Sequence, residues 1–335
     1  MRWDGGVRRM STESKAAIIK TGRSQLRVDI GAVSIILITV LLSIILGATT
    51  SSFFSYNNIY SILFGVSIQF FAIIGFTFLM IMGELDMSVG AVYGFSGTML
   101  GTLMIKTDMP FILAFIVTIL ICACFGMISG YVVTKFRVNS MMVTIGMMTL
   151  IQGINWILIG SLQGYTFPDT YRHFINLRIG AIHWSILFMI LIVVALEILM
   201  KKSTVFKKMY YVGSNIETAR IYGIKSEKIK IITFAVSSAT AAIGGILATS
   251  RIMHADVTTG VNLEFLMITA AVVGGASLFG GKGSVMRSVL GLLFLSVIFN
   301  GMIIFKIDPF IQHVIVGFIL IVAVFIDTLL NKMTK

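Results

Sequence analysis

The segment that decides how this chain folds is residues 201–230, KKSTVFKKMYYVGSNIETARIYGIKSEKIK. It is a long, densely charged stretch inside an otherwise apolar chain, and it is called the central loop below. Apolar runs long enough to span a membrane lie on both sides of it, so it is predicted to lie outside the bilayer, on the cytoplasmic face. Eight of its thirty residues are basic: Lys201, Lys202, Lys207, Lys208, Arg220, Lys225, Lys228 and Lys230.

The central loop is predicted to contain a short helix. The run Ser214-Asn215-Ile216-Glu217 has the pattern of a capping box, in which Ser214 is the N-cap and the Glu217 side chain reaches back to it. Gly223 supplies a residue that can adopt the left-handed conformation and so end the helix. A capped helix between two membrane spans indicates a docking element for a cytoplasmic partner.

Composition places the chain among polytopic membrane proteins. Of its 335 residues, 57% are hydrophobic and 12% are charged, whereas soluble domains are about 25% charged. The net charge of +12 is explained by basic cytoplasmic loops. Because aromatic and basic residues are not interleaved, no nucleic-acid partner is expected. Cys122 and Cys124 lie within an apolar run and are predicted to pack there rather than to bind metal.

An all-α fold with about ten transmembrane helices is predicted, since a helix needs about 20 apolar residues to cross a bilayer. The stretches of suitable length are 30–50, 59–82, 87–105, 111–134, 141–160, 181–200, 229–250, 263–280, 285–305 and 309–329.

The distribution of basic residues sets the orientation. With the N-terminus inside, only five of the 26 Lys and Arg residues remain outside: Lys106, Arg172, Arg178, Arg251 and Lys306. Both termini are therefore predicted to be cytoplasmic, with residues 1–29 as a basic arm and 30–330 as the transmembrane domain. Two segments, 161–180 and 251–262, are expected outside. Each is interpreted either as an interfacial loop with aromatic anchors or as a landing surface for a partner.

The turn between the second and third spans carries two carboxylates, in the sequence GELDMSVG at residues 83–90. Acidic groups at membrane depth are costly and mark functional sites. Asp86 or Ser88 is expected to cap the third helix, and direct contact of Asp86 with a solute is the alternative. The third span then carries Gly90, Gly94, Gly97 and Gly101 on one face, a pattern that permits close helix packing. Gly126 and Gly130 repeat that pattern in the fourth span.

A second glycine-rich break joins the eighth and ninth spans, GGASLFGGKG at residues 274–283. It lacks the spacing of a phosphate-binding loop, so a broken or tightly packed helix is expected there and no nucleotide site. The residues predicted to form the pathway or a structural turn are Glu84, Asp86, Ser88, Gly90, Gly274, Gly275, Gly280 and Gly281.

Other ionisable residues have structural interpretations. Glu197 is spaced to pair with Lys201 one turn later, and Glu264 is placed to favour a helix N-terminus. An ion-coupled secondary transporter, which is the alternative function, would therefore depend on Glu84 and Asp86. An intramembrane enzyme is a third hypothesis, but the sequence shows no catalytic constellation and no metal-ligand spacing.

Four motifs in register resemble one family. The 83–90 turn resembles the GGIDLSVG stretch of the permease subunits of bacterial ATP-driven importers for ribose, xylose, arabinose and autoinducer-2. Residues 143–146, VTIG, resemble that family's ATLG. The residues that match its cytoplasmic loop are Gly213, Asn215, Arg220, Gly223 and Ile224. Those that match its glycine-rich signature are Glu264, Ile268, Ala270, Gly274, Gly275, Ser277, Leu278, Gly280, Gly281 and Gly283.

The chain departs from the family pattern at several positions and represents a divergent branch. Glu84 stands where Gly is usual, Asn139 replaces Pro, Gln152 replaces Arg, Leu266 replaces Asp, and Arg287 replaces Gly. These departures leave the transported sugar unspecified.

The resemblance implies a permease subunit of an ATP-binding-cassette importer for a sugar or similar small polar solute, in the bacterial inner membrane. It implies a dimer with an identical or a related permease, two cytoplasmic ATPase subunits, and an extracytoplasmic solute-binding protein that holds most of the selectivity. ATP would be used by the partner, and this chain would be no enzyme and bind no cofactor. The implied ATPase-coupling residues are Ser214, Asn215, Glu217, Arg220, Gly223 and Ile224, with Arg220 meeting a carboxylate or a helix end of the ATPase.

Overall fold

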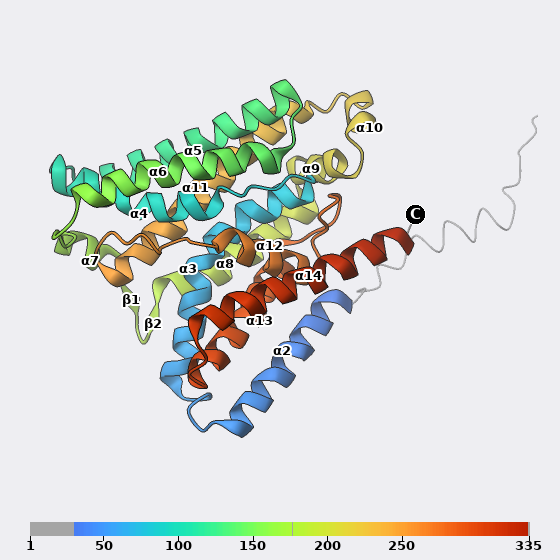
Figure 1. Cartoon of the computed structure of the whole chain (residues 1–335). Helices are drawn as coiled ribbons and strands as arrows, with labels where there is room; N and C mark the ends of the chain where they lie inside the picture. Colours follow the sequence, from blue (N-terminus) through green and yellow to red (C-terminus); the bar gives the residue numbers. More distant parts are fainter. Residues whose placement is uncertain (1–29, 176, 334–335) are drawn as a thin grey trace, which may run out of the picture.

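The computed structural model describes residues 30–175 and 177–333, so the predicted basic arm at 1–29 lies outside the described residues. The described chain is a helical bundle with one short hairpin (Figure 1). Its elements are α2 (Ile30–Thr49), α3 (Tyr56–Ile81), α4 (Val89–Lys106), α5 (Phe111–Phe136), α6 (Ser140–Ser161), α7 (Asp169–Ile175), β1 (Arg178–Ile179), β2 (Ile182–His183), α8 (Trp184–Lys202), α9 (Thr204–Ser214), α10 (Ile216–Ile221), α11 (Ser226–Ile252), α12 (Leu263–Val273), α13 (Val285–Ile304) and α14 (Pro309–Met333).

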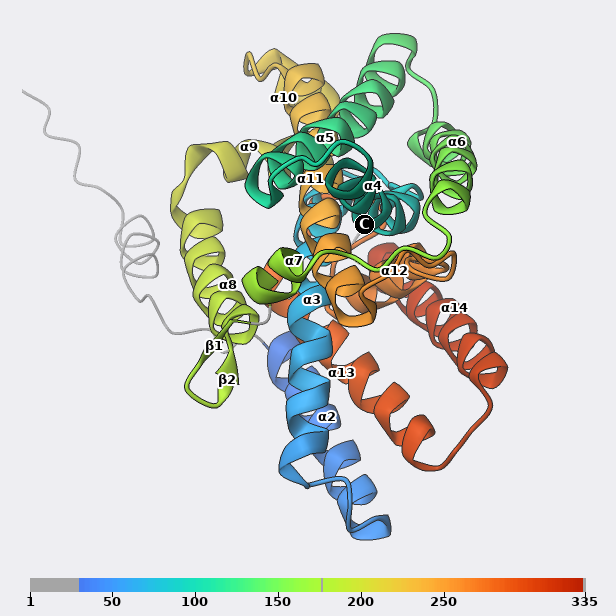
Figure 2. The ribbon, with the colours of Figure 1, turned by 90° about the vertical axis from the view of Figure 1, so that its left-hand side faces the viewer.

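The core of the bundle is built on α3 and α11. These two helices are the most buried of those long enough to span a membrane, and α11 packs against α3, α4 and α5 (Figure 2). Small residues allow this close approach: a Cβ atom at Gly126 of α5 would overlap the Phe234 carbonyl of α11, and one at Gly245 would overlap the Tyr93 carbonyl of α4. The glycine face predicted for the fourth span is therefore confirmed as a packing surface.

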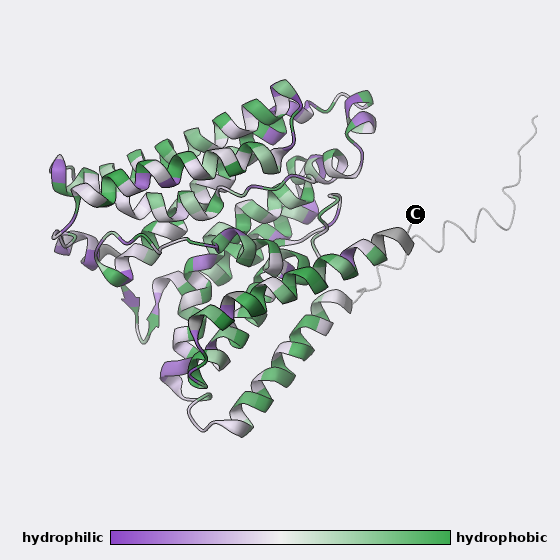
Figure 3. Ribbon diagram, in the orientation of Figure 1, coloured by the Kyte–Doolittle hydropathy of each residue, from purple (hydrophilic) through white to green (hydrophobic). Residues whose placement is uncertain are grey.

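Eight of the described helices are long and apolar enough to cross a membrane. Apolar residues cover α2 and α14, while polar residues gather at helix ends and loops (Figure 3). The start of α2, the end of α14, and the α9–α10 segment lie toward the same side of the bundle (Figure 1). This arrangement agrees with the prediction that the central loop shares one face with both chain ends.

The predicted span at 263–280 is wrong. The helix α12 ends at Val273 after 11 residues, a length of about 16 Å, or half of a bilayer core. It stops because Gly274 and Gly275 turn the chain, and Gly275 has a positive φ of 80°. Residues 274–284 are not helical.

The chain before α12 runs inward beside α4. Thr259 and Gly260 lie against Gly94 and Gly90, in the first two turns of α4, so close that a Cβ atom at either α4 glycine would overlap their carbonyls. The expectation that all of 251–262 is external is therefore wrong for residues 259–262. The glycine face of α4 packs against this non-helical segment as well as against a helix, because a glycine has no side chain to keep the other backbone away.

The other predicted external segment, 161–180, is also partly buried. Phe167 and Tyr171 are enclosed, and the Tyr171 hydroxyl donates to the Ile246 carbonyl of α11. Tyr165 remains exposed, with the Lys106 ammonium 4.2 Å from its ring centroid. Two of the aromatic residues expected at the membrane interface thus belong to the core.

Candidate functional site

The central loop folds into two helices, and its predicted cap is off by one residue. The N-cap of α10 is Asn215, whose side chain accepts a 2.9 Å hydrogen bond from the Thr218 N–H. Ser214 instead ends α9 and donates to the Tyr210 carbonyl at 2.8 Å. Asn215 is the cap because its backbone is extended, with φ −161° and ψ 107°, as an N-cap requires. The predicted capping box with Glu217 is therefore wrong.

The predicted stop at Gly223 is confirmed. Gly223 has a φ of 75°, its N–H donates to the Arg220 carbonyl, and the Ile224 N–H donates to the Ala219 carbonyl at 3.0 Å. These two hydrogen bonds end α10 around Gly223, which has the left-handed backbone conformation that glycine favours.

The exposed end of α10 is apolar. Ile221 and Tyr222 are 84% and 80% exposed, and sequence reasoning did not select them. Arg220, which it did select, lies 3.5 Å from the Glu217 carboxylate and 3.7 Å from that of Glu227. An Ile-Tyr pair directly before the glycine stop of a polar loop is a signal that could have been noticed in the sequence.

The turn after α3, the non-helical loop after α12 and the helix α9 of the central loop meet at one place in the bundle. The Gly281 N–H donates to the Ile81 carbonyl at the end of α3, at 2.8 Å. Gly213 of α9 lies so close to the end of α3 that a Cβ atom there would overlap the Ile81 carbonyl. Gly280 is equally confined, because a Cβ atom there would lie 2.7 Å from the Gly213 carbonyl and 2.9 Å from the Gly83 nitrogen. We call Gly83, Gly213, Gly280 and Gly281 the glycine junction.

Side chains reinforce the glycine junction. The Tyr210 hydroxyl donates to the Gly283 carbonyl at 2.7 Å. Burial, reinforced by the Glu197 carboxylate, raises the pKa of Tyr210 to about 12, so the hydroxyl keeps its proton. Glu197 accepts from Ser284 at 2.8 Å and pairs with Lys201 at 3.0 Å, which confirms the predicted pair. The loop after α12 is thus tied to both α8 and α9.

The carboxylates of the 83–90 turn are both engaged. Glu84 forms a largely buried ion pair with Lys230 in the first turns of α11. Asp86 is fully buried and accepts from the Ser88 N–H at 2.9 Å, the Ser88 hydroxyl at 2.5 Å and the Ser237 hydroxyl at 3.4 Å. Asp86 therefore orders the turn that leads into α4 and joins it to α11.

The start of α6 holds the same turn from the other side. Thr144 accepts from the Met87 N–H at 2.9 Å and Ser140 accepts from the Leu85 N–H at 3.2 Å. Asn139, one of the departures from the family pattern, caps α6 by accepting from the Met141 N–H at 2.8 Å. Thr144, the hydroxyl residue of the VTIG motif, and Ser140 thus satisfy backbone donors of a buried turn.

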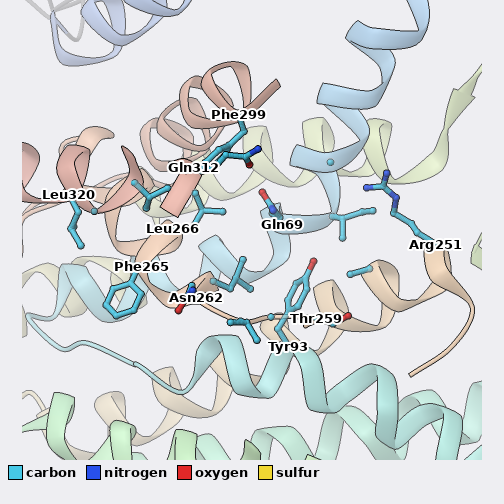
Figure 4. A pocket seen from close by; sticks show the side chains of 18 of the residues that line it. Gln69, Tyr93, Arg251, Thr259, Asn262, Phe265, Leu266, Phe299, Gln312 and Leu320 are labelled. Carbon is cyan, nitrogen blue, oxygen red and sulfur yellow. The ribbon is translucent and has the colours of Figure 1, made fainter. Parts of the chain in front are cut away.

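A separate cavity of about 960 Å³ opens in the bundle between α3, α4, α11, α12, α13 and α14. Non-helical backbone at residues 259–262 lines it, as expected for irregular chain inside a membrane protein. The polar side chains on its wall are Gln69, Tyr93, Arg251, Thr259, Asn262 and Gln312 (Figure 4). We call it the polar cavity.

None of the eight residues predicted for the pathway or a structural turn lines the polar cavity. Gly90 packs against Gly260, which does line the cavity, and Gly274 packs against the Arg287 backbone of α13. Glu84 lines a smaller pocket of about 400 Å³ beside α10. Glu264, in the first turn of α12 as predicted, faces Gly90. Among the departures, only Leu266 reaches the polar cavity.

A bundle of membrane-spanning helices, with a polar cavity inside and a basic loop on one face, is the architecture of a multi-pass membrane transport protein. Residues 58–324 match the family described as the branched-chain amino acid transport system permease component. The chain belongs to this family, which agrees with its resemblance to importer permeases, and it is a multi-pass protein of the bacterial inner membrane.

Curated relatives cover most of the chain. The ribose import permease protein RbsC of Haemophilus influenzae is 32% identical over 87% of this chain and 91% of its own length. The autoinducer 2 import system permease protein LsrC of Photorhabdus luminescens is 29% identical over 84% and 85%. The D-allose transport system permease protein AlsC of Escherichia coli is 28% identical over 84% and 86%. No solved structure matches the chain.

Proposed function

We propose that this chain is the translocation subunit of an ATP-driven importer for a sugar or a similar small polar solute. The observation that carries this proposal is the packing of α9 at the glycine junction, where it contacts both the end of α3 and the non-helical loop after α12. A force applied to the central loop would reach the ends of α3 and α12 through backbone contacts. The names of the relatives, which are permease proteins for ribose import, autoinducer 2 import and D-allose transport, favour the same class of solute.

The family of the chain and its exposed central loop support a set of partners. Two ATPase subunits would bind the central loops of a permease pair, formed with an identical or a related chain, and an extracytoplasmic binding protein would deliver the solute. ATP would be hydrolysed on the ATPase subunits, and no cofactor is assigned to this chain. The solute would cross by way of the polar cavity as the two sides of the bundle open in turn.

The contact with the ATPase is assigned to Ile221 and Tyr222. Tyrosine is among the residue types enriched at the few positions that provide most of the binding energy of protein interfaces, and an exposed isoleucine beside it adds apolar area to bury. Arg220 has two carboxylates of its own chain within 4.0 Å, so it would fix the shape of α10 more than it would contact the partner.

The test is a pull-down of tagged protein from detergent-solubilised membranes. We expect wild type to retain an ATPase subunit, and the double variant Ile221→Asp, Tyr222→Ala to lose at least about 90% of it, since losing two such anchors weakens an interface by more than tenfold. Tyr56→Ala, 65% exposed at the start of α3, is the matched control. An ATPase-free preparation that still transports under an ion gradient would favour the secondary transporter instead.

A further inference from the structure

The polar side chains of the cavity gather around one open volume. Elsewhere in the described bundle many buried hydroxyls donate to a carbonyl one turn back, as Thr77 does to Ile73 and Thr249 to Gly245, although those of Thr118, Ser129, Ser238 and Ser288 have no partner there. At the cavity, the side chains of Gln69, Tyr93 and Gln312 make no hydrogen bond to any part of the chain that the structure describes, and neither does that of Asn262, the N-cap residue of α12.

Tyr93 is the strongest of these observations. It is only 5% exposed, and its ring packs against Gly244 of α11. Its hydroxyl nevertheless points into the polar cavity, toward the space between Gln69 and Arg251 (Figure 4). The hydroxyl oxygen is accessible from the open volume, so its hydrogen-bonding capacity is available to a polar occupant of the cavity, whether water or a solute.

The chemistry of the wall defines that occupant. Each carboxamide of Gln69, Asn262 and Gln312 both donates and accepts, as the Tyr93 hydroxyl does. A solute hydroxyl group has the same dual character. No Asp or Glu lines the polar cavity, and the Arg251 guanidinium at its wall lies 5.1 Å from the Phe64 ring centroid. Among the described residues Arg251 has no ion-pair partner. A cationic solute would therefore be repelled and would find no counter-charge.

We infer that the polar cavity is a recognition site for a hydroxyl-rich solute of monosaccharide size that carries no positive charge, held by Gln69, Tyr93, Asn262 and Gln312. The inference rests on the proposed function and adds that the permease itself selects its solute, beyond the expectation that selectivity lies mainly in a binding protein. The volume of about 960 Å³ is within the range of small-molecule pockets. Binding would be weak, because the cavity must also release the solute.

The test is binding of D-ribose, D-allose and D-xylose to the purified full chain in lipid nanodiscs, measured by saturation-transfer NMR. The variants are Gln69→Leu, Tyr93→Phe and Gln312→Leu. Gln152→Leu and Tyr131→Phe, whose side chains lie outside the polar cavity, are the matched controls. We expect at least one neutral sugar to bind, and each cavity variant to weaken it by about fivefold, the effect of one lost hydrogen bond. The controls should bind like wild type.

D-glucosamine, whose ammonium group adds a positive charge, tests the charge argument, and L-leucine, a zwitterion without hydroxyl groups, tests the need for hydroxyl groups. We expect both to bind more weakly than the best neutral sugar. Failure of all three sugars to bind, stronger binding of either of these two compounds, or equal losses in cavity and control variants would overturn the inference. A chain that retains its ATPase subunit in the pull-down and yet fails here would leave the proposed function standing, so the two can fail separately.

Discussion

The glycine junction and the polar cavity are built in opposite ways. At the junction, backbone meets backbone with no room for a Cβ atom, and the polar groups around it are paired, as in the Tyr210–Gly283 bond and the Glu84–Lys230 ion pair. In the cavity, four polar side chains border open volume without a partner in the described chain. A region that transmits movement must be closely packed, whereas one that binds a solute must keep its polar groups free.

Two helices connect these regions directly. The helix α4 begins after the 83–88 turn and carries Tyr93 into the polar cavity about one turn later. The helix α12 begins at the cavity beside Asn262 and ends at Val273, before the loop that reaches the junction. The helix α12 is only about 16 Å long and α4 about 27 Å, so each is short enough to move as a rigid rod.

The largest effect is expected at the ion pair of the 83–90 turn. Lys230→Gln should lower the free energy of unfolding by about 3 kcal/mol, because it leaves Glu84 as a largely buried, unpaired charge. Lys201→Gln is the matched control, since Lys201 is 73% exposed in its side chain, and it should cost less than about 0.5 kcal/mol. Chemical denaturation in detergent would measure both. Equal losses of stability in the two variants would show that the Glu84–Lys230 ion pair contributes no more than an exposed ion pair.

An intermediate effect is expected from a methyl group at the glycine junction. Gly213→Ala places a Cβ atom against the Ile81 carbonyl, and the displaced backbone should cost about 2 kcal/mol. Gly153→Ala is the control, because nothing lies within 4 Å of a Cβ atom there. Uptake per folded molecule, measured in vesicles with the partner proteins, should fall for Gly213→Ala alone. Unchanged uptake would show that the glycine junction does not transmit movement from the central loop to the bundle.

The smallest effect compares two tyrosine hydroxyls. Tyr210→Phe removes the bond to the Gly283 carbonyl and should cost about 1 kcal/mol of stability. Tyr93→Phe removes an unpaired hydroxyl and should leave stability within about 0.5 kcal/mol of wild type. Thermal unfolding of solute-free protein would compare them. A loss for Tyr93→Phe as large as that for Tyr210→Phe would mean that the cavity hydroxyl has a structural partner.

The sequence by itself determined the features that depend on local pattern. Apolar length and the distribution of basic residues predicted the order of the spans and the position of the central loop, because the bilayer acts on each segment separately. Gly223 ended α10 as predicted, since a left-handed stop is a property of one residue. Three of the four family motifs, at 83–90, in the central loop and in the glycine-rich signature, also contain the glycines that meet at the junction.

Only the tertiary structure decided the cap, the short helix and the cavity. Ser214 and Asn215 are both good caps in isolation, and the choice depends on where α9 ends, which its packing at Gly213 sets. The length of α12 is limited by the inward path of residues 259–262 beside α4. The polar cavity joins residues as distant in sequence as Gln69 and Gln312. No local pattern marks such residues, because what distinguishes them is that they border the same open volume in the folded chain.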